Sequence, residues 1–251
     1  MTRSVRLAAR QALLEQRSFW RSAEYALFTF VFPLMILLLI GAANVGSYLP
    51  GTDVKNTTVF VPSILAFGVI AAAYVNLGSK VAVLRQDGVL KRIKTTPLPS
   101  AAYLGGLLAS TVATVIIITA CTGLIGWVAF GAGPRSDGLP ALIAGLILGI
   151  VCFATLGLAI SSVIPTAESA GPIAYASFLP IAIISGVFDP TFSGLPQWLS
   201  RMVAAFPVKA LAQLLQGAYT ARPFPAWDVA NLGLWTAAGA AFVTWRFRWH
   251  S

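Results

Sequence analysis

The stretch GVLKRIKTTPLPSAAYLGG, residues Gly88–Gly106, lies between two long apolar runs of the chain. It contains three cationic side chains and two prolines, although 57% of the 251 residues are hydrophobic and only 10% are charged. Soluble domains carry about 25% charged residues, and the mean hydropathy here is +0.81. The composition therefore predicts an integral membrane protein in which this polar stretch leaves the bilayer.

Six apolar runs surround the polar stretch and account for most of the chain. A helix needs about 20 apolar residues to cross the bilayer core. The runs are Ala26–Asn44, Val59–Ser79, Ala101–Gly131, Leu139–Ile164, Pro172–Phe188 and Trp227–Trp245. We therefore predict an all-α integral membrane protein with six transmembrane helices, organised as a single transmembrane domain over residues 1–251.

The cationic side chains gather on one side of the predicted membrane. Of the 17 Lys and Arg residues, twelve lie before the first run, after the second run or after the sixth. By the positive-inside rule, we expect a multi-pass protein of the cytoplasmic membrane with both termini in the cytoplasm. The net charge of +9 follows this pattern rather than a soluble basic face, so the lipid bilayer is an expected partner and nucleic acid is not.

The N-terminal segment has its arginines in helical register. They are Arg3, Arg6, Arg10, Arg17 and Arg21. At about 100° per residue they fall within an arc of roughly 60°. This register favours an interfacial helix over residues 1–24 with its arginines toward lipid headgroups or an acidic partner. The alternative is an ordinary positive flank, which needs no helical register.

The polar stretch itself predicts a short helix that ends at prolines. Pro97 and Pro99 cannot continue a helix, and each pushes the preceding residue toward extended geometry. We expect a cytoplasmic helix over Leu84–Lys94, within an element spanning residues 84–96. It is either a docking element for a soluble partner or a solvated basic loop that only sets topology.

A second irregular region covers residues 189–225 and lies on the outer side by the charge count. Two short amphipathic pieces, Gln197–Phe206 and Val208–Tyr219, meet at Pro207. Each piece is too short to span the bilayer. Two arrangements fit: a re-entrant helical pair before the last span, or an amphipathic cap outside the membrane.

The chain lacks the motifs of an energy-converting enzyme. It contains no G-x-x-x-x-G-K-[ST] phosphate loop, and its one histidine, His250, stands next to the last residue. Glu24, Glu168 and Asp189 stand at the ends of apolar runs rather than in their middles. Carboxylates in the middle of a span mark proton or ion coupling, so their position at the ends of runs leads us to expect an external energy source. From the missing phosphate loop and the single histidine we expect no bound cofactor, no metal site and no enzymatic activity of the chain's own.

The order of short motifs in residues 157–211 is similar to that of a known family. A Ser-rich turn leads to a glutamate, an S-G-x-x-x-P pattern follows, then Leu-Pro with a tryptophan, and a proline inside the re-entrant pair. In this sequence the motif residues are Glu168, Ser185, Gly186, Pro190, Leu195, Pro196, Trp198 and Pro207. With the basic N-terminal helix and GVLKRIKTTPLP, the chain resembles, over nearly its whole length, the permease subunit of type-2 ATP-binding-cassette exporters, in the daunorubicin-resistance-like branch.

The resemblance implies a half-transporter that functions in efflux, including multidrug resistance. Two permeases, identical or paralogous, would form the path, and soluble ATP-binding-cassette subunits would bind ATP and Mg. The N-terminal helix would be the connecting helix. The residues that would contact the ATPase are Arg85, Asp87, Lys91, Arg92 and Lys94 of the coupling helix, with Glu168 in the other cytoplasmic loop.

The outer gate would include Ser185, Gly186, Pro190 and Pro207, and here the chain departs from the family pattern. Family members often place an arginine about ten residues after the re-entrant proline, where this chain has Gln216 and Gly217. The residue before Pro190 is usually apolar or aromatic, and here it is Asp189. Both departures concern the gate and leave the expected fold unchanged.

The expected function is ATP-driven export of an amphipathic or hydrophobic substrate, drug-like or lipid-like, by alternating access. Phe67, Tyr74, Phe178 and Phe188 are the candidate path residues, with helix packing as the alternative role. Two other classes compete with this one. A secondary transporter or channel without an ATPase predicts a titratable group near the midplane, and a membrane enzyme or assembly factor predicts a reactive cluster at one interface. The sequence has neither feature.

Overall fold

The structure is a computed structural model that describes residues 3–89, 92, 100–188, 196–220 and 225–246. Within these residues the chain is helical, without β-strands, which confirms the predicted all-α class. The one β-like feature described is an isolated bridge between Tyr48 and Lys55.

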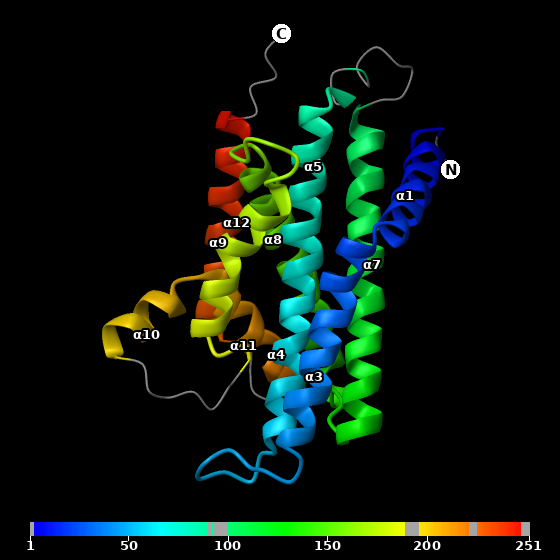
Figure 1. Ribbon diagram of the computed structural model, residues 1–251. Helices are drawn as coiled ribbons and strands as arrows, with labels where there is room; N and C mark the ends of the chain where they lie inside the picture. The colour runs from blue at the N-terminus through cyan, green and yellow to red at the C-terminus, as the bar shows by residue number, and fades with distance from the viewer. Residues whose placement is uncertain (1–2, 90–91, 93–99, 189–195, 221–224, 247–251) are drawn as a thin grey trace.

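The helices follow the predicted apolar runs in chain order (Figure 1). They are α1 (Arg3–Arg21), α2 (Ala23–Ala26), the π-helical η1 (Leu27–Val31), α3 (Phe32–Ala43), α4 (Asn56–Ile70), the π-helical η2 (Ala71–Asn76), α5 (Leu77–Gln86), α7 (Ser100–Phe130), the 3-10 turn η3 (Ser136–Gly138), α8 (Leu139–Ser161), α9 (Ala170–Ile184), α10 (Gln197–Ala204), α11 (Pro207–Thr220) and α12 (Ala226–Arg246).

Three of the described helices are long and apolar enough to cross a membrane. They cover Asn56–Gln86, Ala102–Phe130 and Ser136–Ser161, and two shorter apolar helices cover Leu27–Ala43 and Ala170–Ile184. This confirms an apolar helical bundle of the kind that spans bilayers. The count of six spans stays a prediction.

The bundle has two distinct ends (Figure 1). The terminal end carries the N- and C-termini, the end of α5 and the connection between α8 and α9. The far end carries the connections between α3 and α4 and between α7 and α8. The successive long helices run in alternating directions between these ends.

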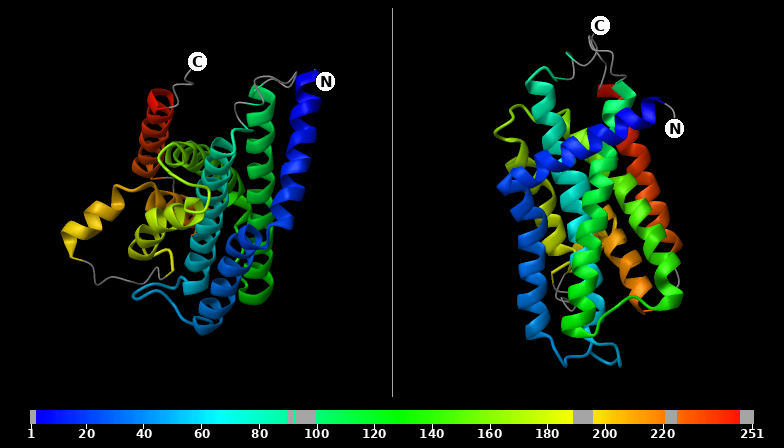
Figure 2. Two further views of the ribbon diagram at one scale, coloured as in Figure 1. Left: turned by 45° about the horizontal axis from the view of Figure 1, so that its top comes forward. Right: turned by 90° about the vertical axis from the view of Figure 1, so that its right-hand side faces the viewer.

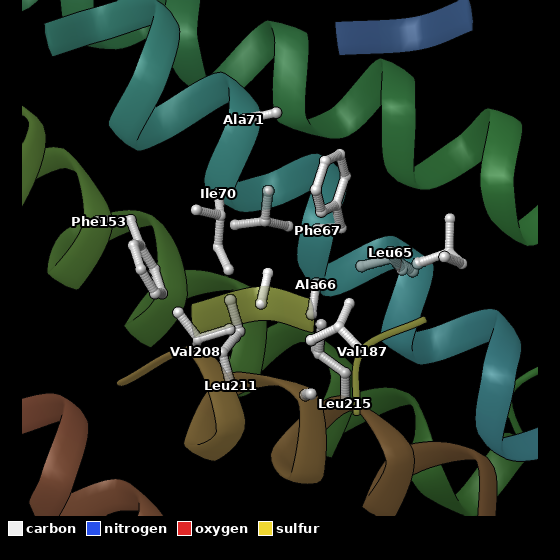
Figure 3. Close-up of a cluster of buried hydrophobic side chains, with 14 of the residues drawn as sticks. Leu65, Ala66, Phe67, Ile70, Ala71, Phe153, Val187, Val208, Leu211 and Leu215 are labelled. Carbon is white, nitrogen blue, oxygen red and sulfur yellow. The ribbon is translucent and has the colours of Figure 1, made fainter. Parts of the chain in front are cut away.

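One continuous helix, formed by α4, η2 and α5 and called the central helix below, occupies the middle of the bundle. In its most apolar stretch of 18 residues, 89% of the residues are buried inside the protein. The corresponding shares are 28% in α7 and 33% in α8. Figure 3 shows the core around the central helix, where Ile70 of α4 lies near Phe153 of α8 and Leu211 of α11. The central helix therefore contacts protein on all sides, while α7 and α8 keep lipid-facing surfaces.

Glycine allows the central helix and α8 to touch backbone to backbone. A Cβ atom at Gly157 would lie 2.8 Å from the carbonyl oxygen of Ala73, and one at Gly78 would lie 2.8 Å from the carbonyl oxygen of Gly157. Real Cβ atoms do not approach backbone this closely, so only glycine fits both positions. This crossing fixes η2 against α8.

π-Helical turns occur in both of the first two apolar runs. Pro33 follows η1, and its ring would clash with the carbonyl four residues earlier in a regular helix. A wider turn before the proline reduces this clash. Pro62 in α4 is accompanied by Ser63, whose hydroxyl donates to the carbonyl of Val59 at 2.8 Å. Both helices thus pass a proline without ending.

Candidate functional site

The first candidate region is a polar junction where α1 meets α5 and α7, made of Gln11, Glu15, Gln16, Ser18 and Lys80. Glu15 is only 8% exposed. Its Oε2 lies 3.3 Å from Lys80 Nζ, and its Oε1 accepts a hydrogen bond of 2.8 Å from Gln11 Nε2. Lys80 Nζ also donates to Ser18 Oγ at 3.3 Å. A buried carboxylate with these partners ties α1 firmly to the central helix.

The same junction holds α1 along α7, as Figure 2 shows for the blue and green helices. Gln16 Nε2 donates to the carbonyl of Ser110 at 2.8 Å and to Thr114 Oγ1 at 3.0 Å. Gly106 permits this approach, because a Cβ atom there would lie 2.9 Å from the carbonyl of Ala8. The face of α1 that meets α7 is therefore polar, whereas Leu13 and Leu14 stay exposed.

A small polar cavity of about 60 Å³ lies inside the junction and extends to η2. Asn76 of η2 donates to Thr29 Oγ1 of η1 at 2.6 Å, so the two π-helical turns meet through this bond. π-Helical turns often mark functional positions. Hydrogen bonds thus join α1 and η1 to the central helix on one side.

The N-terminal arginines lie away from these contacts. Arg6, Arg10, Arg17 and Arg21 are exposed on α1, within the predicted segment 1–24. The side chain of Arg3 lies outside the described residues. The placement of this helix at the bilayer surface stays a prediction.

The second candidate region is the loop contact at the terminal end. Arg85 Nη2 of α5 donates to the carbonyl of Ile164, and the backbone N–H of Ala167 donates to Gln86 Oε1. The turn between α8 and α9 is also closed internally, by a 2.8 Å bond between the hydroxyls of Thr166 and Ser169. The end of the central helix and the turn that carries Glu168 are therefore fastened to each other.

The predicted start of the coupling helix at Leu84 is wrong. Leu84 and Arg85 belong to α5, which continues the central helix to Gln86. The chain turns at Asp87 and Gly88, where the Asp87 N–H bonds the carbonyl of Val83 and Gly88 takes a positive φ of 68°. Glycine at this position ends helices because it adopts φ > 0 without strain. The break therefore falls four residues later than predicted.

The remaining coupling residues divide between exposed positions and positions outside the described residues. Asp87, Arg92 and Glu168 are exposed at the terminal end. A helical turn begins after Gly88, since the Arg92 N–H bonds the Gly88 carbonyl at 3.0 Å. Lys91, Lys94 and both prolines of the stretch lie outside the described residues.

The predicted path residues form one aromatic cluster. Phe67 lies 5.3 Å from Phe178 and 5.1 Å from Phe188 between ring centroids, and Tyr74 lies 6.3 Å from Phe178. Phe67 is fully buried in the core, so in this conformation it packs helices together. Tyr74 and Phe178 instead border an open space.

That space is the third candidate region, an apolar cavity of about 320 Å³. Its walls come from η2, α8, α9, α11 and α12. At its inner wall the hydroxyl of Tyr74 and Ser177 Oγ lie 2.8 Å apart in a hydrogen bond. Phe153, Phe206 and Trp235 supply much of the remaining surface. This volume is at the lower end of ligand sites in proteins.

The predicted outer region shows two different helices. α11 lies inside the bundle against α4, α8 and α12, and Gln216 Nε2 donates to Ser63 Oγ of α4 at 2.8 Å. α10 projects away from the bundle, with Trp198 64% exposed (Figure 1). Because α11 is buried in the bundle, it does not fit a cap outside the membrane. The position of α10 does not distinguish a re-entrant pair from such a cap.

The predicted gate residues lie near this region. Ser185 and Gly186 form the turn that ends α9, with Gly186 at a positive φ of 73°. Pro207 is buried at the start of α11 and borders the apolar cavity. Pro190 lies outside the described residues.

Sequence reasoning missed the side chains that hold the break between α10 and α11. Asn231 Nδ2 donates to the carbonyls of Ala204 and Ala205, at 3.2 Å and 3.0 Å, and Trp235 Nε1 donates to the carbonyl of Ala205 at 2.7 Å. These carbonyls have no partner within α10 because the helix ends there. It also missed Glu15, whose signal was a lone acidic residue between arginines on α1.

Reactive groups are scarce in the described parts of the chain. No cluster of three His, Cys, Asp or Glu side chains that could hold a metal ion occurs among them. Cys121 and Cys152 are free thiols. The three regions consist of hydrogen-bonded contacts between helices and an apolar cavity.

Comparison with known proteins accounts for this combination. Residues 7–219 match the family described as ABC-2 type transporter, in its membrane domain. No curated protein matches the chain significantly. The matched segment begins in α1 and ends in α11, so it includes the polar junction, the loop contact and most of the cavity wall. The chain belongs to the ABC-2 type transporter family.

Proposed function

We propose that this chain moves an amphipathic or hydrophobic substrate out of the cell by alternating access, with ATP hydrolysed by separate subunits. Family membership makes it the multi-pass membrane subunit of an ABC-2 exporter with an ATP-binding-cassette partner. The match over residues 7–219 is the observation that carries the proposal. The sequence arguments above support three further parts of the proposal. They are the substrate class, the placement of the terminal end in the cytoplasm and the dimeric assembly.

The loop contact supplies the mechanical step. Arg85 and Gln86 stand where the central helix leaves the bundle, and their bonds to Ile164 and Ala167 join them to the α8–α9 turn. We expect the ATPase to press on the segment beyond Gly88 and on Glu168 together. A displacement there would move the central helix, whose other contacts form the polar junction and the cavity.

The proposal is tested by capture of the partner from mild detergent. In one variant a Gly/Ser linker of equal length replaces residues 88–94, which leaves α5 intact. In the matched control the same linker length replaces residues 46–52 at the far end. We expect a protein with a phosphate-loop motif, identified by mass spectrometry, to co-purify with the wild type and the control and to disappear with the first variant.

Two other results would contradict the proposal. If the wild type captures no such ATPase with or without nucleotide, the exporter lacks its energy source and the secondary transporter becomes the better reading. If both linker variants retain the ATPase equally, the segment beyond Gly88 is not the coupling element.

A further inference from the structure

The apolar cavity is built differently from the contacts that explain coupling. It lies between α9 and α12, with α8 as its floor and Pro207 of α11 at one end. Among the described helices α9 packs on α5 and η2, while α12 packs on α8 and α11. The two flanking helices therefore border the cavity from opposite sides, and the space between them is called its mouth below.

The described lining of the cavity offers hydrocarbon and aromatic surface, and none of the hydrogen-bonding side chains described there is left without a partner. The Tyr74 and Ser177 hydroxyls bond each other at 2.8 Å, and Ser177 Oγ also donates to the carbonyl of Ala174 at 2.7 Å. The indole N–H of Trp235 donates to Ala205. Water needs two to four polar partners to occupy a site, so this cavity favours an apolar occupant.

The size and direction of the cavity suit a hydrocarbon chain. At about 30 Å³ per water-sized group, 320 Å³ holds about ten such groups. On α8 the lining runs from Phe153 to just past the end of the helix at Val163, a distance of about 15 Å at the helical rise. Val163, at the terminal end, is 56% exposed. The cavity is thus elongated along the bundle, and its lining on this side ends at an exposed residue of the terminal end.

A positive charge follows the cavity lining along α12. Arg246 follows Phe242, which lines the cavity, by four residues and so shares its face of α12. Arg246 is exposed. Glu168 is the described carboxylate nearest in sequence to Val163, but its turn is held toward α5 by Gln86. The mouth therefore combines a hydrocarbon slot with a cation, which matches a lipid with an anionic headgroup.

We propose that this cavity binds one acyl chain of an anionic membrane phospholipid in each protomer, with its headgroup at Arg246. The site lies within a single chain and needs neither ATP nor the partner subunit. It is therefore independent of the proposed transport function, and either one can fail without the other.

Native mass spectrometry of the full chain, released from detergent with added phosphatidylglycerol or phosphatidylcholine, tests the cavity. Ala159→Trp on α8 fills the slot, and Ala144→Trp puts the same side chain on an exposed position of the same helix. We expect Ala159→Trp to weaken the affinity for the most tightly bound phosphatidylglycerol molecule about tenfold, and Ala144→Trp to leave this affinity unchanged. Equal binding by the two variants would overturn the proposal.

The headgroup half is tested by Arg246→Gln, with Arg201→Gln on the exposed surface of α10 as control. One basic side chain near a lipid surface favours anionic headgroups by about fivefold. We expect the wild type and Arg201→Gln to bind phosphatidylglycerol more tightly than phosphatidylcholine, and Arg246→Gln to lose this preference. A wild type that binds both lipids equally would refute the anionic assignment.

A measurement without any substitution of α8 guards against a misfolded Ala159→Trp variant. Phosphatidylglycerol with brominated acyl chains quenches tryptophan fluorescence on contact. We expect this lipid to quench the fluorescence of the wild type at a low ratio of lipid to protein. Trp235→Phe should remove part of this quenching, because Trp235 lines the slot. Trp198→Phe, on projecting α10, serves as control. Identical quenching curves for the wild type and Trp235→Phe would place no chain in the cavity.

Discussion

The two sides of the central helix are built in opposite ways. On the side of α1 and α7, Asn76 and Lys80 are one turn apart and both form hydrogen bonds, around a polar cavity of about 60 Å³. On the side of α8, α9 and α12, Tyr74 borders an apolar cavity of about 320 Å³. Tyr74 and Asn76 are two positions apart, so their side chains point to nearly opposite faces of the helix.

The difference indicates which neighbours follow the central helix when it moves. Hydrogen bonds and buried ion pairs are directional, so a shift of Lys80 carries α1 with it or breaks the contact. Hydrocarbon contacts are not directional, and an unfilled volume lets side chains rearrange. We therefore expect α1 to move with the central helix as one body, while α9 and α12 move relative to it. The crossing at Gly157 is the fixed point between the two sides.

The largest expected effect comes from breaking that fixed point. In Gly157→Ala the new methyl group would lie 2.8 Å from the backbone oxygen of Ala73, which only a shift of the whole helix relieves. We expect a loss of about 2–3 kcal/mol in the free energy of unfolding, measured by denaturation in mixed micelles.

The control for this change is Gly233→Ala on α12, where an added Cβ atom meets nothing within 4 Å. Alanine is favoured over glycine in a helix by up to about 1 kcal/mol, so this variant should be unchanged or more stable. If the two variants behave alike, the crossing of the central helix with α8 does not hold the two sides in register.

A smaller loss is expected from the polar side. Lys80→Ala leaves the Glu15 carboxylate, 8% exposed, with Gln11 but without its cation. Breaking a fully buried pair costs about 3–5 kcal/mol. Since the Lys80 side chain is 31% exposed, we expect about 1–2 kcal/mol in the same unfolding assay.

A double-mutant cycle with Glu15→Ala distinguishes the pair from its surroundings. If the bond between α1 and α5 carries the effect, adding Glu15→Ala to Lys80→Ala should restore part of the lost stability, because no unpaired carboxylate is left. Strict additivity of the two losses would argue that Lys80 acts through other contacts.

The apolar side predicts a weaker response to the loss of a polar group. Tyr74→Phe removes one hydrogen bond to Ser177, whose hydroxyl keeps its bond to Ala174. We expect a loss of about 0.5–1 kcal/mol, and unchanged phosphatidylglycerol binding in the mass-spectrometric assay. A loss as large as that of Lys80→Ala would mean that both sides depend on hydrogen bonds.

Much of the helical framework followed from the sequence because bilayer thickness and helical periodicity fix it. The apolar runs locate the long helices within a few residues, and the arginine register locates α1. The charged residues predict a new helix that starts at Leu84, whereas α5 continues to Gln86. Gly88 after Gln86 and Asp87 was the better signal, since a glycine there permits the positive φ that ends a helix.

The site was less accessible to sequence reasoning, since its parts come together only through tertiary packing. Glu15 and Lys80 are 65 positions apart, and no local pattern pairs them. The sequence names Phe67, Tyr74, Phe178 and Phe188 as candidate path residues, but it does not show that Phe67 is buried while Tyr74 borders a cavity. An amphipathic pattern in α11 shows one apolar face without naming the helices that cover it. The cavity between α9 and α12 is a property of packing alone.

The smallest expected effect belongs to the exposed ion pair between Arg135 and Asp137, which is the counterpart of the buried pair at Glu15. Arg135 Nε lies 3.0 Å from Asp137 Oδ1, and both side chains are 59% exposed. The hydrogen bond from Arg135 lowers the pKa of Asp137 below its ordinary value. A carboxyl with a lowered folded-state pKa adds stability above its ordinary pKa and loses it as the pH falls through the folded value. Because water screens this pair, we expect Arg135→Ala to raise the pKa of Asp137 and to lower the unfolding midpoint only slightly at pH 7, and we expect this small difference from wild type to vanish at acid pH. A loss at pH 7 equal to that of Lys80→Ala would show that burial does not set the strength of the two pairs.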